Sequence, residues 1–154
     1  MQNNSIRKFR ESIRRLQRGL NWQWKVDAAC CGITVAQCHA LLEIGSQKEI
    51  TLVDLSLLLS LDTSTLSRTI DGMSRADLVE RKPNPDDRRY MIITLTEKGC
   101  KIYNEINQTF DHYYSDILGA IPAARQEQVL ESIEILSKAL AEKENSSCCK
   151  MGEE

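Results

Sequence analysis

Apolar residues recur at helical spacing near the start of the chain, with polar residues between them. They are Ile6, Phe9, Ile13, Leu16 and Leu20. This period predicts an amphipathic helix over residues 5–28. The pattern breaks at Cys30, Cys31 and Gly32.

Three shorter helices follow this break. Thr34 can cap a helix over residues 35–44, which Gly45 is expected to end. Thr51 begins the next helix, whose leucines face a core. The fourth helix covers residues 63–76. Either Asp62 or Thr63 caps it, and its apolar face is Leu66, Ile70 and Met73.

The hydrophobic period then becomes strand-like. Residues 78–81 form a short strand, and residues 90–95 are rich in β-branched side chains. Between them, Pro83 and Pro85 disfavour a paired ladder and favour a turn. This segment predicts a β-hairpin whose tip, the wing, lies within residues 83–90.

Two long helices complete the pattern, one over about residues 97–118 and one from Pro122 to about residue 142. The fold class is therefore mainly α with a small β-hairpin. Two helices joined by a short turn before a hairpin make a winged helix-turn-helix. We predict a single domain over residues 1–143, its winged helix at about 34–98, and a polar tail over residues 144–154.

The composition is that of a soluble globular protein, with 42% hydrophobic and 27% charged residues among 154. No apolar run approaches the roughly 18 residues that span a bilayer. The first ten residues lack the apolar stretch of a secretory signal. We expect a cytoplasmic protein without a membrane partner. Its six cysteines are then thiols, metal ligands or redox sensors rather than a disulfide framework.

The net charge of −2 argues against a nucleic-acid-binding protein, since many such domains are basic. The charges are unevenly distributed, however. Residues 1–18 are strongly basic, with Glu11 as the single acidic side chain, and residues 119–154 are mainly acidic. A basic face can therefore exist on this acidic chain.

The fourth predicted helix begins with side chains suited to double-stranded DNA. The candidate contacts are Thr63, Ser64, Thr65, Ser67 and Arg68. A recognition helix places its first residues against base edges in the major groove. Short hydroxyl side chains permit a close approach there, and Arg68 can donate bidentately to guanine O6 and N7.

The predicted wing carries three further candidate contacts, Asp87, Arg88 and Arg89. An arginine at this tip fits the minor groove, where narrow A·T tracts concentrate negative potential. Asp87 can hold the guanidinium of Arg89 in one orientation through paired hydrogen bonds.

Four features together resemble the DNA-binding region of the MarR family. They are the Ser64–Ser67-Arg68 helix, the Leu78-Val79-Glu80-Arg81 strand, the Asp87-x-Arg89 pair and the Leu95-Thr96-x-x-Gly99 segment. With Thr34-x-x-Gln37 upstream and the last helix downstream, the resemblance covers about residues 5–142. It implies a homodimer with intertwined helices over about residues 5–28 and 97–142. It also implies a repressor on a near-palindromic operator.

The sequence departs from this family pattern in two ways. Gly72 stands inside the recognition helix, at a cost of about 1 kcal/mol relative to alanine. The cysteines, which include two adjacent pairs, are not part of the general pattern.

The adjacent cysteine pairs predict a site for a thiophilic ligand. Thiolates are soft donors, and three of them suit As(III) or Sb(III). Cys30 or Cys31 would combine with Cys148 and Cys149 of the same or of the other subunit in the implied dimer. Binding of the ligand would then release the operator. Cys38 and Cys100 fall where small apolar residues pack, so we expect both in the core.

Other ligands remain open from the sequence alone. Zn(II) or cadmium needs four ligands, which Cys38 or His39 can complete. A disulfide between a tail cysteine and Cys30 or Cys31 is a redox alternative. A phenolic ligand can use Trp22, Trp24, Tyr103 and Tyr113, which suit dimer packing equally well.

An enzyme is not expected, because the chain has no Gly-rich phosphate loop, nucleophile elbow or HExxH, and His39 and His112 are isolated. A purely structural dimerisation module leaves the wing unexplained.

Overall fold

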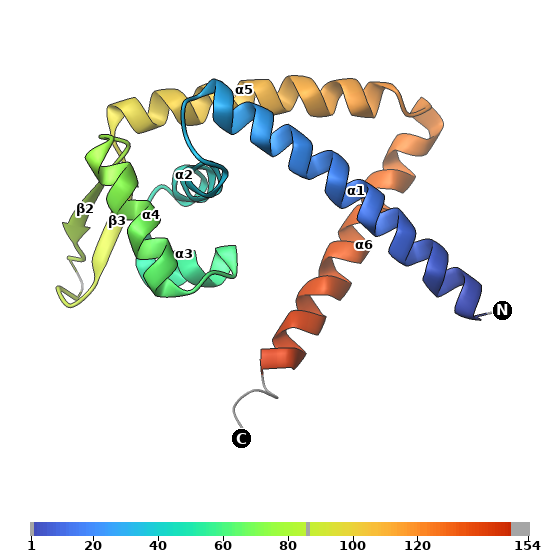
Figure 1. Cartoon of the computed structure of the whole chain (residues 1–154), viewed down its shortest axis with the longest axis horizontal. Coiled ribbons are helices and arrows are strands. Elements are labelled where there is room, and N and C mark those ends of the chain that lie inside the picture. Colours follow the sequence, from blue (N-terminus) through green and yellow to red (C-terminus); the bar gives the residue numbers. More distant parts are fainter. Residues whose placement is uncertain (1, 86, 149–154) are drawn as a thin grey trace. The chain divides into compact units, whose positions relative to one another are not determined.

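The computed structural model describes residues 2–85 and 87–148. Contacts divide the chain into two compact units, Met1–Thr109 and Phe110–Glu154. The elements in chain order are α1 (Gln2–Cys30), α2 (Val35–Gln47), β1 (Ile50–Thr51), α3 (Leu52–Leu59), α4 (Thr63–Arg75), β2 (Val79–Pro83), β3 (Met91–Leu95), α5 (Glu97–Gly119) and α6 (Ala123–Cys148) (Figure 1). This order confirms the predicted mainly helical fold with one hairpin.

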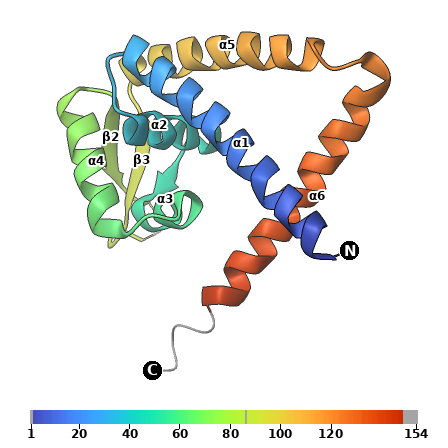
Figure 2. The same ribbon diagram turned by 45° about the vertical axis from the view of Figure 1, so that its right-hand side comes forward.

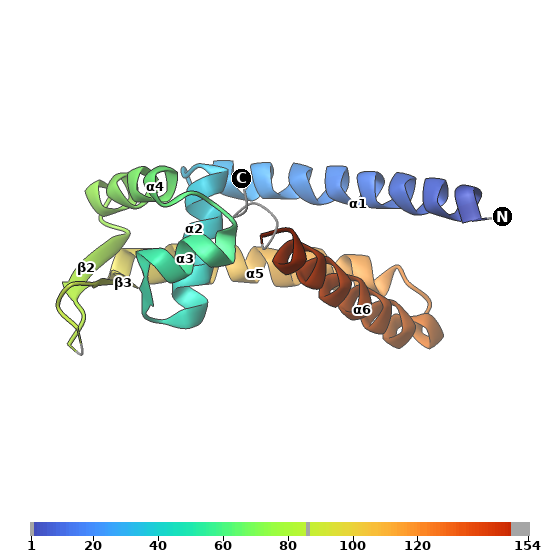
Figure 3. The same ribbon diagram turned by 90° about the horizontal axis from the view of Figure 1, so that it is seen from below.

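Helices α2, α3 and α4 form the centre of the first unit, with the β2–β3 hairpin beside them (Figure 2). Leu66, Ile70 and Met73 lie on one face of α4 and are fully buried, as predicted. This face packs where α4 meets α2 and α3. Figure 3 shows the short turn that joins α3 to α4, the helix-turn-helix of the sequence prediction.

Helix α2 begins as predicted but ends later. Thr34 Oγ1 accepts a hydrogen bond from the backbone N of Gln37 at 3.2 Å, and Gln37 Oε1 accepts one from the backbone N of Thr34 at 2.9 Å. This is a capping box. Gly45 does not end the helix, which continues to Gln47. Its role is packing, because a Cβ there would lie 2.4 Å from the Tyr103 ring.

The three strands form an antiparallel sheet in the order β1-β3-β2. Pro83 pairs with Met91 at the end of the edge strand β2, where a proline is tolerated. The sequence did not predict β1, in which Thr51 pairs with Ile92. Thr51 is also the N-cap of α3, with Oγ1 accepting from the backbone N of Asp54 at 3.1 Å.

The start of α5 is fixed against the turn that follows α4. Thr96 Oγ1 donates to the carbonyl oxygen of Asp77 at 2.6 Å and accepts from the backbone N of Gly99 at 3.0 Å. Gly99 lies so close to this turn that a Cβ would be 2.0 Å from the carbonyl oxygen of Leu78. The Thr96-x-x-Gly99 pattern therefore fixes the start of α5 to the turn between α4 and β2.

The second unit contains the end of α5 and the helix α6. The side-chain amide of Gln126 donates to the carbonyl oxygens of Leu118 and Ile121, at 3.0 and 3.2 Å, and so closes the turn between these helices. Helix α6 continues past the predicted end near residue 142 to Cys148, so the first residues of the predicted tail are helical. Among the described residues, no helix is long and apolar enough to cross a membrane.

Candidate nucleic-acid interface

Asp62 fixes the start of α4. Its Oδ1 accepts hydrogen bonds from Ser64 Oγ at 2.5 Å and from the backbone N of Thr65 at 2.8 Å. The hydrogen bonds from Ser64 and Thr65 hold the pKa of Asp62 well below its usual range. The N-cap is thus Asp62 rather than Thr63, and its negative charge suits the helix N-terminus.

The residues predicted to read DNA lie at this start of α4. Four of them are exposed: Thr63, Ser64, Thr65 and Arg68. Ser67, which follows the fully buried Leu66, is only partly exposed. Ser64 and Arg68 are one helical turn apart and therefore share a face. This face presents a hydroxyl and a guanidinium together.

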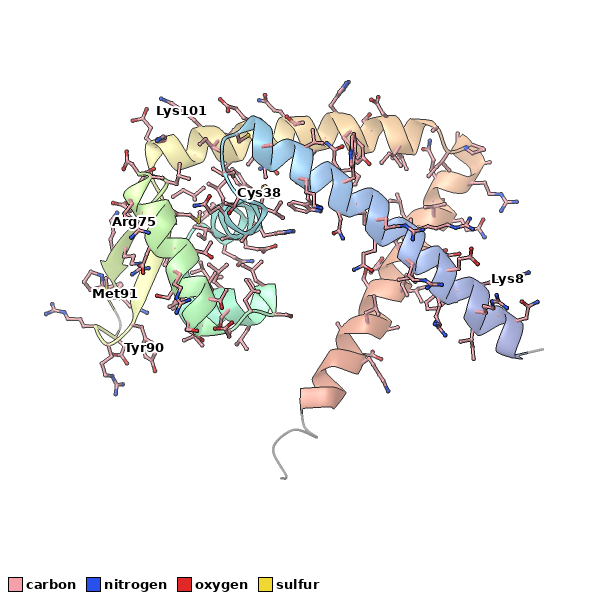
Figure 4. All side chains as sticks on the ribbon, viewed as in Figure 1. Lys8, Cys38, Arg75, Tyr90, Met91 and Lys101 are labelled. Atoms are coloured by element: carbon pink, nitrogen blue, oxygen red, sulfur yellow. The ribbon has the colours of Figure 1, made fainter. Side chains whose placement is uncertain are left out.

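In the wing, the carboxylate of Asp87 holds the guanidinium of Arg89, as the sequence predicted. Arg89 Nε donates to Oδ1 and Oδ2 of Asp87 at 3.0 and 3.1 Å, and its Nη2 donates to Oδ2 at 2.7 Å. These bonds lower the pKa of Asp87 and raise that of Arg89. The Arg89 side chain is still 84% exposed, and Arg88 is also exposed. Tyr90 and Met91 lie at the same end of the hairpin (Figure 4).

The sequence reasoning missed an ion pair that joins α4 to the hairpin. Arg81 Nη2 on β2 donates to Asp71 Oδ1 at 2.6 Å. Two opposite charges on neighbouring elements were the available signal, but they do not specify a contact until the angle between helix and strand is known.

A second missed contact lies at the C-terminal end of α4. Lys98 Nζ donates to the carbonyl oxygen of Ala76 at 2.8 Å. A lysine is favourable there because it satisfies a carbonyl at the negative end of the helix dipole. The first contact therefore joins α4 to β2, and the second joins the start of α5 to the end of α4.

The predicted thiol site falls mostly outside the described part of the chain. Cys31 follows α1 and is partly exposed. The side chains of Cys30 and Cys148, and the whole of Cys149, lie outside the described residues. Among the described side chains, no group of three or more His, Cys, Asp or Glu residues is arranged to hold a metal ion. The As(III) or Sb(III) site stays a prediction.

The remaining cysteines differ from each other. Cys38 is completely buried within the winged-helix unit, as predicted (Figure 4). Cys100 was predicted to be in the core, but it is exposed. It follows Gly99, and one residue turns a helix by about 100°, so Cys100 points away from the face that packs on Leu78.

The aromatic residues named for a phenolic ligand have separate surroundings. The Trp24 ring stacks on His39 with centroids 4.0 Å apart, and burial lowers the pKa of His39 against a smaller opposing effect of Glu43. Tyr103 packs on Gly45, and Trp22 is exposed. Tyr113 makes an edge contact with Tyr114 at 5.2 Å in the second unit. The phenolic-ligand reading stays a prediction.

Comparison with known proteins relates the winged helix to a family. The MarR family model matches residues 33–91. The multiple antibiotic resistance protein MarR of Escherichia coli (strain K12) is 38% identical over 76 residues, which are 49% of this chain and 53% of that protein. The chain thus spans about half the length of this relative. The HTH-type transcriptional regulator BilQ of Clostridium symbiosum is 23% identical over 77% of this chain and 81% of that protein.

Solved structures share the fold. Streptococcus pneumoniae FabT in complex with DNA has a TM-score of 0.77 at 18% identity, over 87% of this chain and 98% of that one. A mutant of Escherichia coli MarR has a TM-score of 0.68 at 27% identity, over 84% and 94%. These likenesses agree with the family match and with the helix order described above. The MarR family model thus matches the winged-helix region of the chain, residues 33–91.

Proposed function

We propose that the chain is a homodimeric DNA-binding transcription regulator that acts as a cytoplasmic repressor. One observation carries this proposal. The exposed start of α4, with Ser64 and Arg68 on one face, is tied to a wing whose Arg89 is already oriented by Asp87. The family match supports the same function, since the solved FabT structure is a DNA complex. The role is regulatory rather than catalytic, as the names of its relatives indicate.

The two parts of this surface suit different grooves. The start of α4 is narrow and carries short hydroxyl side chains, so it can enter the major groove with Arg68 on a guanine edge. Arg89 at the wing can then enter the adjacent minor groove, where A·T tracts are narrow and strongly negative. Arg88 beside it is a candidate phosphate contact.

A dimer is proposed because the long helices keep apolar side chains exposed in a single chain. On α1 these are Ile6, Phe9, Leu16, Leu20, Trp22 and Val26, and on α6 they are Leu130, Ile133, Ile135 and Leu140. The N-terminal half of α1 is basic and α6 is mainly acidic. Burial of these apolar side chains favours pairing with a second copy of the chain. The opposite charges of α1 and α6 favour contact between these two helices.

DNA binding can be tested on duplexes selected from a random library. Arg68→Ala should weaken binding to the selected duplex about 5-fold to 150-fold, as expected for one bidentate base contact. Arg89→Ala should weaken binding most on A·T-rich flanks. The control is Arg15→Ala, which removes an equal charge from α1 and should change affinity little. The proposal fails if no duplex is selected, or if all three variants lose affinity equally.

For the inducer, we propose a thiophilic ligand bound by Cys30, Cys31, Cys148 and Cys149. The support is the two adjacent thiol pairs and the partly exposed Cys31 at the end of α1.

Operator affinity should therefore fall with arsenite or antimonite but not with Zn(II), peroxide or a phenolic acid. Native mass spectrometry would identify the bound ion. Cys148→Ser with Cys149→Ser should abolish the response, whereas the control Cys100→Ser, which changes an exposed single thiol, should keep it. An intact response in the tail variant would exclude this site.

A further inference from the structure

Helix α3 has an apolar face that the fold does not cover. Leu55 and Ser56 point into the core, yet Leu57 is 72% and Leu58 is 53% exposed. Asp54, Leu57 and Leu58 follow the i, i+3, i+4 pattern of a single face of α3. A helix that is apolar on both sides normally buries both sides.

This face lines an open groove of about 730 Å³ within the first unit. The remaining walls are the end of α2, strand β1, the β3 residue Ile92, and Asn84 and Pro85 of the wing. The register pair Thr51 and Ile92 joins β1 to β3 along the groove. Small-molecule sites usually have volumes of about 300–1,000 Å³, so the size suits a small ligand.

The charged groups of the groove are acidic, beside the neutral polar side chains of Gln47, Thr51 and Asn84. Glu49 and Asp54 both line it, and the lining formed by described residues includes no lysine or arginine. Thr51 Oγ1 donates to Asp54 Oδ2 at 2.6 Å, which orients this carboxylate. Neither carboxylate forms an ion pair with a described residue. Two carboxylates beside leucine and isoleucine side chains complement an apolar cation and repel phosphates.

We propose that this groove binds a small organic cation with an apolar body, such as an aromatic ammonium or phosphonium ion. The leucines of α3, with Ile92 and Pro85, contact the apolar body, and Glu49 and Asp54 face the charge. Among the described residues that line it, the groove includes none of the proposed DNA-contacting side chains of α4 and the wing tip, and none of the adjacent cysteine pairs. Binding here does not depend on the proposed DNA contacts, so it can be measured on the protein alone.

The test is a methyl NMR titration of the full chain with tetraphenylphosphonium, with tetraphenylborate as the matched anion. The cation should shift the methyl signals of Ile50, Leu57, Leu58 and Ile92 in a saturable way. Ile133 and Leu140 on α6, both 54% exposed in a single chain, lie outside the groove and should not shift. Equal binding of the anion, or shifts mainly on α6, would show non-specific apolar adsorption and overturn the proposal.

Charge variants test the two carboxylates. Glu49→Gln should weaken cation binding about fivefold, and adding Asp54→Asn about 25-fold, from Coulomb attraction near 4 Å in water. Glu131→Gln on α6 is the matched control and should keep the affinity. Leu57→Ser should also weaken binding and, because Leu57 is so exposed, should leave the fold intact. An unchanged affinity in Glu49→Gln and Leu57→Ser, or signals that move with protein concentration alone, would exclude this site as a cation site.

Discussion

Arg89 owes its orientation to its own neighbour rather than to the core. The carboxylate of Asp87 accepts from Nε and Nη2 of Arg89 and from its backbone N at 3.0 Å. An exposed arginine without such a partner would lose more side-chain entropy on entering a narrow groove. The short Asp-x-Arg spacing therefore prepares a flexible side chain for binding.

This pairing makes the pKa of Asp87 depend on Arg89. The ionised carboxylate accepts the hydrogen bonds, so its pKa is lowered, first by the Arg89 side chain and then by the Arg89 backbone. The contribution of this pair to wing stability is present above the ordinary carboxyl pKa of about 3.9 and is lost as the pH falls through the lowered value. DNA binding near neutral pH should thus not titrate with Asp87. A carbon NMR titration should give a lower midpoint for Asp87 in the unmodified chain than in Arg89→Gln. Equal midpoints would show that the pair does not persist in solution.

Gly99 is required by close backbone contact rather than by a turn. The Cβ of an alanine would lie 2.0 Å from the carbonyl oxygen of Leu78, and backbone atoms cannot move away cheaply. Gly99→Ala should destabilise the fold by about 3 kcal/mol or more, at the upper end of overpacking effects. Urea denaturation measures this change. The control is Gly19→Ala on α1, where nothing lies within 4 Å, and it should stabilise the chain by up to about 1 kcal/mol. Similar stabilities of the two variants would contradict this account.

At the scale of elements, the angle between α4 and the hairpin is set by contacts from several directions. Asp71 on α4 pairs with Arg81 on β2, and Lys98 on α5 bonds to the carbonyl oxygen of Ala76. The Thr96 hydroxyl holds the carbonyl oxygen of Asp77 in the intervening turn. If α4 and the wing contact two DNA grooves at once, as proposed, the angle between them must stay constant. Residues that do not touch DNA can then control the affinity for DNA.

A double-mutant cycle on Asp71→Asn and Arg81→Gln tests this connection. The pair is partly exposed, so its coupling in urea denaturation should be about 0.2–1 kcal/mol. Both variants should also bind DNA more weakly, because the angle between α4 and the hairpin is then no longer fixed by this ion pair. The comparison pair is Glu11 and Arg15 on α1, at the same distance of 2.6 Å. Its removal should affect stability similarly but leave DNA affinity unchanged. A loss of DNA affinity in both pairs would indicate a general charge effect.

The elements with a long hydrophobic period could be predicted from the sequence, and those set by tertiary contact could not. The buried face of α4 and the Thr34 capping box follow from local spacing. The predicted end of α2 was wrong because Gly45 packs against Tyr103, which is far away in the sequence, and does not end the helix. Strand β1 has two residues, too few for any alternation.

The candidate site shows the same division. The exposed start of α4 and the Asp87–Arg89 pair depend on residues close in sequence, and both were predicted. The Asp71–Arg81 pair needs the packing angle of two elements, which the sequence does not specify. Cys100 was placed in the core because its type is often buried, but its neighbour Gly99 takes the packed position.

At the scale of the whole molecule, the long helices are the part that a single chain leaves incomplete. The winged-helix core buries its apolar residues, among them Leu41, Leu66 and Ile93. Helices α1 and α6 instead leave many apolar side chains in contact with water. Exposed apolar surface on this scale marks an interface, which the proposed homodimer would cover.

A charge placed on the apolar face of α6 should therefore separate the dimer. Ile133 is 54% exposed in the single chain, and its burial in a symmetric dimer occurs twice. Ile133→Asp removes about 3 kcal/mol or more of apolar burial over the two copies, which corresponds to at least about a hundredfold weaker association. Sedimentation velocity over a range of concentrations measures this. The control is Val53→Asp on α3, which is 49% exposed but outside both long helices, and it should leave association unchanged. A monomer has only one of the proposed DNA-binding surfaces. The Ile133→Asp variant should therefore bind an operator with two half-sites no more tightly than a single half-site. A variant that stays dimeric would place the interface elsewhere on the chain.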